Sequence, residues 1–353
     1  MMEDEKPKHV RRERYKGTHP KSFKEKYKEQ QPERYAYDVE KVLAQGRTPA
    51  GMHRSICVTE IMEFLKITPG QVGLDATLGY GGHSLEILKC LQPGGKLFAI
   101  DVDPIELERT QERLTTLGFG PEVLAIQRMN FSDIDKIVEQ AGPLNFVLAD
   151  LGVSSMQIDN PERGFSFKVD GPLDLRLNPT SGKSAAALLK NSSQKKLAEL
   201  FLENADEPYY EAIADAIITN RSNGTMITTT TQLKELITET LLSLSANFEK
   251  EDIKKSCQRC FQALRIAVNN EFDVLEQFLE KLPYALAPGG RVAILSFHSG
   301  EDRRVKKSFQ HLFRQDVYCE VAPGPIAASP EECFANPRAR SAKLRWAIKA
   351  EEV

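Results

Sequence analysis

A glycine-rich turn between two apolar strands constrains the fold of this 353-residue chain more than any other feature. Residues 72–75 are typical of a short apolar strand, and the turn that follows reads Gly-Tyr-Gly-Gly at 79–82. A helix is expected from about 83 to 91, and a second strand ends at Asp101. An acid roughly 20 residues after such a turn is where a ribose hydroxyl is usually held. The pattern predicts half of an α/β sheet that binds an adenosine-containing cofactor.

The details of the turn favour a methyl donor over a dinucleotide. A dinucleotide-binding turn normally reads G-x-G-x-x-G, whereas Ser84 stands at the third glycine position. Asp75 ends the first strand, and a carboxylate there would repel a pyrophosphate but suit an ammonium or sulfonium group. S-adenosylmethionine carries both of these groups. A tight turn without a ligand is the alternative for the glycines alone, and Ser84 and Asp75 disfavour a nicotinamide-dependent dehydrogenase.

The composition excludes several classes of protein. The formal net charge of −3 does not indicate a globally basic nucleic-acid binder. No run approaches the roughly 18 apolar residues that span a bilayer, and the first residues lack the apolar centre of a signal peptide. We therefore expect a cytoplasmic protein with no membrane contact. Cys257 and Cys260 have CxxC spacing without a second ligand pair at a zinc-like interval, so we expect free thiols and no metal.

The order of the expected elements divides the chain into four parts. Residues 1–50 form a basic N-terminal arm, which is either a solvated tail or an arm that contacts RNA. Residues 51–158 alternate helix and strand, as in a Rossmann-like, doubly wound parallel sheet. Residues 159–260 show little strand signal and are expected to form an inserted helical domain for substrate recognition, and residues 261–353 complete the sheet domain.

Hydrophobic periodicity gives the approximate bounds of the elements. Helices are expected over 56–65, 83–91, 104–117, 131–140, 195–202, 209–219 and 231–244, and strands over 72–75, 98–101, 123–127, 146–150 and 291–296. A turn is expected at 288–290, and the basic and then apolar segment 336–348 is consistent with a final strand.

Acids at the strand ends indicate a ligand crevice. Asp75, Asp101 and Asp150 each end an expected strand, and ligands of open α/β sheets bind outside the carboxyl ends of the strands. All three are therefore expected to point into one crevice. Capping of the following helix is the structural alternative for each acid.

Six motifs, in the right order, closely resemble one protein family. They read DATLGYGGHS from 75, LADLGVSSMQIDNPERGFSF from 148, DGPLDLRLNP from 170, FQALRIAVNNE from 261, LSFHSGEDRRVK from 295 and NPRARSAKLR from 336. They resemble the bacterial ribosomal RNA small subunit methyltransferase H family, also called MraW, over about residues 50 to 347. The resemblance implies a class I S-adenosylmethionine-dependent fold with an inserted helical domain. It also implies methylation of the exocyclic N4 amine of one cytidine in the decoding region of 16S rRNA, with the free rRNA or the small ribosomal subunit as partner.

The resemblance also implies the residues of the site. Cofactor contacts would fall on Gly81, Gly82, His83, Asp101 for the ribose, Phe131 near the adenine, Asp150 and Gln157. The amine of cytosine is a poor nucleophile because its lone pair is delocalised into the ring. A group that accepts its N–H bonds would direct the lone pair outward, so Asp150, with the carbonyl groups of residues 151–153, is the candidate catalytic residue. Methyltransferases that act on such amines in DNA often carry a D/N/S-P-P-Y/F element, which this chain lacks at Asp150.

Other residues could complete the same pocket. Phe297, in the segment 296–299, could stack on an extruded base, and Glu301 could lie near it, although a core phenylalanine is the alternative. Eight arginines could contact phosphates near the mouth, or be paired with acids: Arg163, Arg176, Arg259, Arg265, Arg303, Arg304, Arg338 and Arg340. The segment 206–212 lacks the basic residues that are usual in the family, which questions the contribution of the insertion to RNA contact. Two other functions stay open: a methyltransferase of the same fold that acts on DNA or protein, and a non-catalytic RNA-binding assembly factor.

Overall fold

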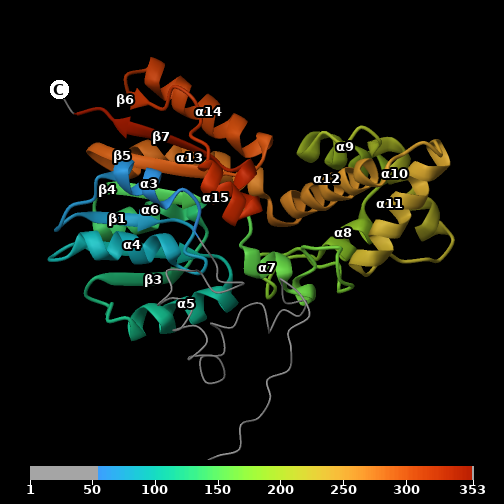
Figure 1. Ribbon diagram of the computed structural model, residues 1–353, viewed down its shortest axis with the longest axis horizontal. Helices are drawn as coiled ribbons and strands as arrows, with labels where there is room; N and C mark the ends of the chain where they lie inside the picture. Colours follow the sequence, from blue (N-terminus) through green and yellow to red (C-terminus); the bar gives the residue numbers. More distant parts are fainter. Residues whose placement is uncertain (1–54, 352–353) are drawn as a thin grey trace, which may run out of the picture. The chain divides into compact units, whose positions relative to one another are not determined.

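The computed structural model describes residues 55–351, so the basic arm expected at 1–50 lies outside the described residues. The described chain forms a sheet covered by helices on both faces. A separate group of helices lies beyond the end of the sheet where the parallel strands terminate (Figure 1). Within this part of the chain no helix is both long and apolar enough to cross a bilayer.

The sheet has seven strands in the order β3-β2-β1-β4-β5-β7-β6. Their bounds are β1 (Val72–Asp75), β2 (Lys96–Asp101), β3 (Leu124–Arg128), β4 (Leu144–Asp150), β5 (Leu286–Ser296), β6 (Tyr318–Val321) and β7 (Lys343–Lys349). The first five strands are parallel, whereas β7 runs antiparallel to both β5 and β6. The strand order reverses at β1 and β4, and a crevice at such a switch point is the usual ligand site of open α/β sheets.

Side chains of β4 alternate between two hydrophobic clusters, which is why the strand is continuously apolar. Val147 and Ala149 belong to the cluster covered by α6 (Ile134–Ala141), α13 (Glu271–Ala285) and α14 (Ser299–Arg314). Phe146 and Leu148 belong to the opposite cluster, which is covered by α3 (Val58–Leu65), α4 (Gly82–Leu91) and α5 (Pro104–Thr116). The predicted doubly wound sheet is thus confirmed.

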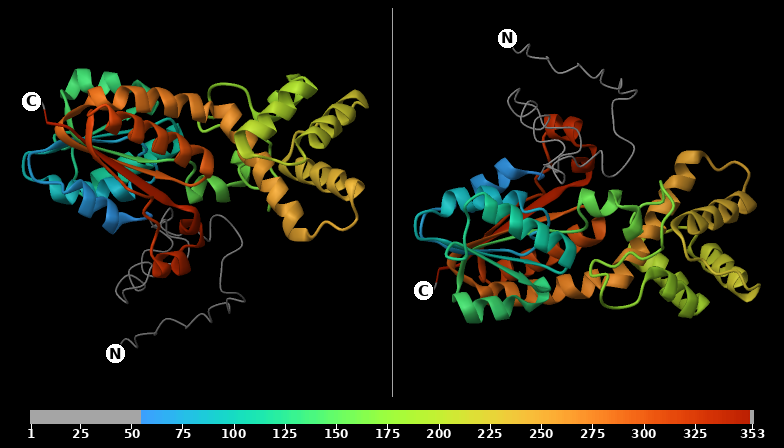
Figure 2. Two further views of the ribbon diagram at one scale, coloured as in Figure 1. Left: turned by 90° about the horizontal axis from the view of Figure 1, so that it is seen from above. Right: turned by 90° about the horizontal axis from the view of Figure 1, so that it is seen from below.

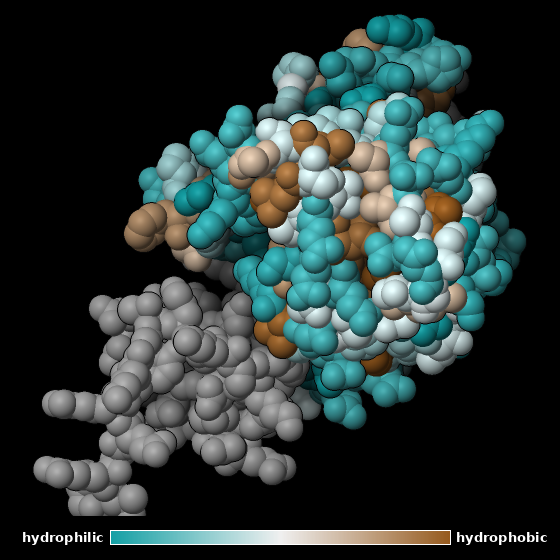
Figure 3. All heavy atoms as spheres, turned by 90° about the vertical axis from the view of Figure 1, so that its right-hand side faces the viewer, coloured by the Kyte–Doolittle hydropathy of each residue, from teal (hydrophilic) through white to brown (hydrophobic). Residues whose placement is uncertain are grey.

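A third hydrophobic cluster holds the inserted helices together, apart from the sheet (Figure 2). Its helices are α8 (Ala185–Asn191), α9 (Gln194–Ala205), α10 (Tyr210–Ser222), α11 (Thr230–Leu244) and α12 (Lys250–Asn269), and the short α7 (Ser155–Asp159) precedes them. The hydroxyl of Ser193 caps α9 and that of Thr229 caps α11, each by accepting a backbone N–H of its helix. The face that the insertion presents in Figure 3 is mainly hydrophilic, with separate hydrophobic spots.

Several bounds differ from the sequence expectations. The turn expected at 288–290 lies inside β5, where pairing jumps from Leu286 opposite Leu144 to Arg291 opposite Phe146. The segment expected as one helix from 131 is a short 3-10 helix, η2 (Phe131–Asp133), followed by α6. The last strand begins only at 343, because residues before it form α15 (Pro330–Ala335) and the 3-10 helix η4 (Pro337–Ser341).

The long helix α12 and the edge strand β6 were not predicted. Position 260, expected as the end of the insertion, lies inside α12, whose Phe261 and Leu264 still pack in the helical cluster. Cys257 and Cys260 are buried in the same cluster as free thiols, and burial raises the pKa of Cys257 to about 11. The division into four parts stays a prediction.

Candidate active site

A cavity of about 330 Å³ opens at the carboxyl ends of the strands. Its wall includes the glycine-rich turn, the ends of β2 and β4, the junction of α12 and α13, and part of η4. Every predicted cofactor residue lines it: Gly81, Gly82, His83, Asp101, Phe131, Asp150 and Gln157. Phe297 and Glu301 line the same cavity, as the sequence indicated.

The glycines of the turn are required by close packing. Gly81 has a φ of +71°, and a Cβ there would lie 2.7 Å from Cγ2 of Thr110. A Cβ on Gly82 would lie 2.0 Å from Oγ of Ser55. No side chain caps the start of α4, so its first N–H groups and positive dipole end are available to a ligand in the cavity.

Asp75 does not line the cavity, so the expectation that it faces a ligand is wrong. Its side chain is buried behind the turn, where Oδ2 accepts a 2.6 Å hydrogen bond from Ser84 and Oδ1 accepts one from the backbone N–H of Thr77. Burial raises the pKa of Asp75, and the bond from Ser84 partly offsets this. Ser84 thus replaces the third glycine of the dinucleotide pattern because it holds the strand-end acid.

Asp101 fixes the turn to the end of β2. Oδ2 of Asp101 accepts a 2.7 Å hydrogen bond from the N–H of Gly79, and Oδ1 accepts one of 2.9 Å from the N–H of Asp103. Burial raises the pKa of this carboxyl to about 6. An ionised carboxylate has about four acceptor sites, so these two bonds leave acceptor capacity for a ligand.

The two carboxylate oxygens of Asp150 differ: one lies within ion-pair distance of His83, and the other has no hydrogen-bond partner among the described residues. Its Oδ2 lies 3.6 Å from Nδ1 of His83, while Nε2 of His83 is 3.0 Å from the carbonyl oxygen of Ile56. Its Oδ1 is buried and has no hydrogen-bond partner within residues 55–351. Burial raises the pKa of Asp150 to about 6, although His83 lowers it in part. A buried acceptor without a protein partner is available to a donor from water or from a ligand in the cavity.

Gln157 and Phe131 are engaged by neighbouring protein groups. Nε2 of Gln157 donates to Oδ2 of Asp103 at 2.7 Å, and its Oε1 accepts from the N–H of Ser154 in a capping box. Phe131 packs edge-on against Phe278, with ring centroids 5.2 Å apart. Both residues line the cavity, and their contact with the cofactor stays a prediction.

A network of largely buried charged groups lines another part of the cavity. Arg265 binds both carboxylate oxygens of Glu271 at 2.8 Å. Glu301 accepts a hydrogen bond from the N–H of Phe297 and lies 3.1 Å from Nε2 of His298. Burial raises the pKa of Glu301, but His298 and Arg265 more than offset this, so the pKa lies below its usual range. Sequence reasoning missed Glu271, although it ends the FQALRIAVNNE motif.

Most of the arginines expected to contact phosphates are paired with acids. The pairs are Arg163–Asp103, Arg176–Asp174, Arg259–Glu207, Arg265–Glu271, Arg304–Glu276 and Arg338–Asp159. Among the described residues, Arg303 and Arg340 are the two of the eight for which we find no acidic partner within salt-bridge distance, and both are exposed. The alternative of acid pairing thus holds for the other six.

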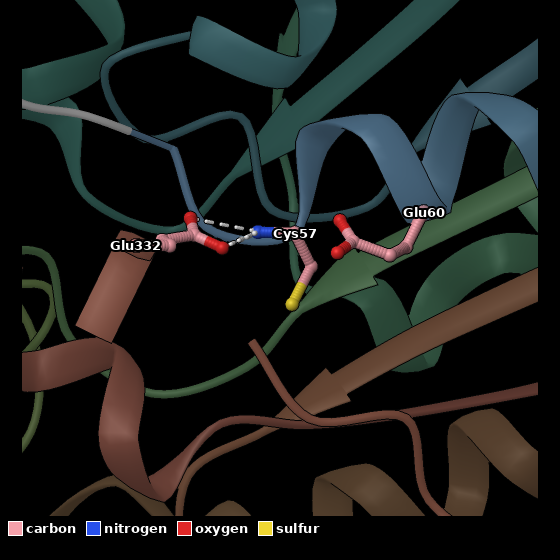
Figure 4. A group of neighbouring side chains, drawn as sticks. All are labelled: Cys57, Glu60 and Glu332. Atoms are coloured by element: carbon pink, nitrogen blue, oxygen red, sulfur yellow. Dashed lines mark hydrogen bonds between the residues drawn. The ribbon is translucent and has the colours of Figure 1, made fainter. Parts of the chain in front are cut away.

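One cluster of possible metal ligands ties the start of the described chain to α15. Both carboxylate oxygens of Glu332 accept the N–H of Cys57, at 3.1 and 3.3 Å, with Glu60 beside them (Figure 4). Burial, together with the charges of Glu332 and Glu60, raises the pKa of Cys57 to about 12. The thiolate is the form that binds metals, so this cysteine is a poor ligand. A second cluster consists of Glu271, His298 and Glu301. The absence of a metal stays a prediction.

The strand order and the cavity at the switch point fit a class I methyltransferase, and the family match identifies its cofactor as S-adenosylmethionine. The MraW methylase family matches residues 50–350, and the chain belongs to this family. The resemblance seen in the six motifs is thereby confirmed, as are the fold class, the enzyme class and the cofactor.

Curated relatives match nearly the whole chain. "Ribosomal RNA small subunit methyltransferase H 2" of Alkaliphilus metalliredigens (strain QYMF) is 68% identical over 349 residues, which cover 99% of this chain and 100% of the relative. "Ribosomal RNA small subunit methyltransferase H 1" of Lachnoclostridium phytofermentans is 64% identical over 348 residues, covering 99% of this chain and 95% of the relative. "Ribosomal RNA small subunit methyltransferase H 1" of Agathobacter rectalis is 55% identical over 350 residues, which cover 99% of this chain and 100% of the relative.

Proposed function

We propose that this protein transfers the methyl group of S-adenosylmethionine to the N4 amine of a cytidine in the decoding region of 16S rRNA. One observation carries the proposal: relatives named for small-subunit ribosomal RNA methylation match the chain from end to end at up to 68% identity. The substrate is the free rRNA or the small ribosomal subunit, and we place the reaction in the cytoplasm, without a membrane partner.

The residues at the turn fit the cofactor. We propose that it lies along the backbone of Gly81 and Gly82, beside His83, with its ribose hydroxyls donating to Asp101 and its adenine near Phe131. The short helix α7, which contains Gln157, also lines the cavity. When bound, the cofactor supplies an activated methyl group on a positively charged sulfur.

Asp150 is the proposed catalytic residue. Its unpartnered Oδ1 accepts an N–H of the target amine, which directs the nitrogen lone pair out of the ring. His83, 3.6 Å from the other carboxylate oxygen, holds Asp150 in place. The nitrogen would bond to the methyl carbon as the carbon–sulfur bond breaks and the sulfur leaves as a neutral thioether. Asp150 would take the proton that the amine loses, and a pKa of about 6 suits it to do so near neutral pH. Most of the rate gain comes from holding the two reacting atoms at contact distance.

The target base must leave its stack to reach Asp150. Phe297 lines the cavity close to Gly152, whose φ of +94° lets the loop after β4 turn beneath the ring. We propose that Phe297 stacks on the extruded cytosine, as aromatic residues do in other base-flipping sites. The inserted helices would then contact the RNA around it.

The test is methyl transfer from labelled cofactor to deproteinised 16S rRNA, small ribosomal subunits, DNA and protein in parallel. We expect label in rRNA, in free form or in the subunit, and mapping should place it on a cytidine of the decoding region. Label only in DNA or protein would replace the substrate assignment. Cofactor binding without transfer to any of the four would indicate a non-catalytic RNA-binding factor.

A further inference from the structure

We propose that α15 and η4 form a rim of the cavity that binds the nucleotide next to the target, with Phe334 stacking on its base and Arg340 contacting its phosphate. This inference rests on the proposed function, since it requires RNA as the substrate. We call this segment, residues 330–341, the rim.

The rim adjoins the cavity directly. Asn336, Arg338 and Ser341 line the cavity, and Phe334 and Arg340 lie between or beside them in the chain. Figure 1 shows α15 near the carboxyl ends of the strands, where the chain approaches the inserted helices. A nucleotide strand that places one base in the cavity must pass the residues at its mouth.

One side of the rim is anchored to the rest of the protein. Its backbone is therefore ordered, while its other side stays exposed. Ser329 caps α15 by accepting the N–H of Glu332, and the carboxylate of Glu332 binds the N–H of Cys57 (Figure 4). Cys333 packs against the hydrophobic cluster of the sheet. Phe334, next in the chain, is 87% exposed. An aromatic ring on an anchored helix loses little conformational freedom when it stacks, because its backbone is already ordered.

The aromatic ring and the unpaired cation of the rim favour RNA over a solvated surface role, whereas the exposed carboxylate of Glu331 on the same helix opposes it. Single exposed hydrophobic residues are common and need no explanation by themselves. Here, however, the exposed ring lies on the same rim as exposed Arg340, which has no acidic partner within salt-bridge distance among residues 55–351. Its neighbour Arg338 is held by Asp159 at 2.9 Å and faces the cavity. An aromatic ring and an unpaired cation on one segment are a combination that binds single-stranded nucleic acid.

Tyr284 offers a matched control. It is the only other aromatic with a comparable exposure in the described chain, at 84%, and it ends α13 just before β5 begins. The start of β5 is the end of the sheet opposite the cavity, because the cavity lies at the carboxyl ends of the strands. Removing the Tyr284 ring therefore shows the effect of losing an exposed aromatic side chain that is not part of the rim.

The experiment compares Phe334→Ala, Phe334→Trp and Tyr284→Ala in methyl transfer to small-subunit RNA. Stacking on an aromatic side chain contributes roughly 5- to 150-fold in affinity per base. We expect Phe334→Ala to raise KM for the RNA by a factor in this range, while kcat and the Kd of the cofactor change less than about twofold. Phe334→Trp should restore KM, and Tyr284→Ala should leave it unchanged. Arg340→Ala should lower the slope of log affinity against log salt by about 0.7.

The outcomes separate the two proposals. A KM for Phe334→Ala that equals that of Tyr284→Ala, with wild-type activity on RNA intact, would overturn the rim proposal alone. A fall in kcat or in cofactor affinity at unchanged KM would also overturn it, because it would assign Phe334 to the cofactor half of the cavity. A wild-type protein that methylates no RNA would overturn the proposed function, and the rim proposal with it.

Discussion

Nη1 of Arg163 lies 2.7 Å from Oδ2 of Asp103, and both side chains are buried. Asp103 also caps α5 by accepting the N–H of Ile105, and Arg163 donates to the carbonyl oxygens of Arg176 and Leu177. The pair therefore joins the end of β2, beside the cofactor half of the cavity, to the loop that leads into the inserted helices.

We expect Arg163→Met to lower the free energy of unfolding by about 3–5 kcal/mol, because it leaves the Asp103 carboxylate buried without its charge partner. Arg176→Met is the matched control, since its pair with Asp174 is partly exposed and should contribute less than about 1 kcal/mol. Urea denaturation followed by circular dichroism measures both. Equal losses for the two variants would contradict the assignment.

Asp150→Asn should lower kcat by about 100-fold or more, because the amide can neither carry the charge of the carboxylate nor take the proton from the amine. The Kd of S-adenosylmethionine should change only a few-fold. Asp135→Asn, which removes an exposed carboxylate bound to Lys281, serves as the control and should keep full activity. Single-turnover methylation with calorimetry for the cofactor would test this, and near-normal kcat in Asp150→Asn would remove Asp150 from the mechanism.

The pH dependence follows from the raised pKa of Asp150, about 6. Activity should be lost as the pH falls below about 6, because the protonated carboxyl no longer accepts from the amine. Stability should move the other way. An aspartate whose pKa is higher in the folded state than the unfolded value of about 3.9 favours folding at low pH, and this contribution is lost as the pH rises through about 6.

The pH dependence of stability that comes from Asp150 can be measured by comparing wild type with Asp150→Asn. Wild type should gain stability relative to Asp150→Asn as the pH falls from 7 to 4, since the asparagine cannot bind the proton. Chemical denaturation of both proteins across this range is the measurement. A difference that stays constant with pH would show that the pKa of Asp150 is not raised in the folded protein.

Asp101→Asn should weaken S-adenosylmethionine binding by about 10- to 100-fold, because charge-assisted hydrogen bonds contribute roughly 1.5–3 kcal/mol. At saturating cofactor, kcat should fall much less, since Asp101 lies at the ribose rather than the methyl group in the proposed pose. Calorimetry and steady-state kinetics separate the two effects. Unchanged affinity would place the ribose elsewhere.

Gly82→Ala should destabilise the protein, because the added Cβ would lie 2.0 Å from Oγ of Ser55. The double variant Gly82→Ala with Ser55→Gly should recover most of the loss, since the obstruction is one small side chain. Gly81→Ala should not be rescued in this way, because its φ of +71° strains any residue with a Cβ. Thermal unfolding of the three variants measures this, and rescue of Gly81→Ala would contradict the backbone explanation.

Much of the sheet domain could be predicted from the sequence. The strand at 72–75 has its expected bounds, and β2 and β4 end at the expected Asp101 and Asp150. The expected bounds of the helices over 83–91 and 104–117 differ from the structure by a single residue. Parts with less distinctive local patterns were missed. The helix α12 is strongly charged along its exposed side, and the four-residue β6 is too short to show a period.

The sequence by itself determined the parallel sheet and the glycine turn, because each depends on residues that are neighbours in the chain. The class of cofactor followed from the six family motifs, since the local argument from Asp75 was wrong. Tertiary structure decided which strand-end acid faces the cavity: Asp75 turns to Ser84, whereas Asp101 and Asp150 line the cavity. It also decided which arginines stay free, since partners such as Asp103 for Arg163 and Glu207 for Arg259 lie 60 and 52 residues away. Pairing over such separations follows from how the elements pack, which no local pattern encodes.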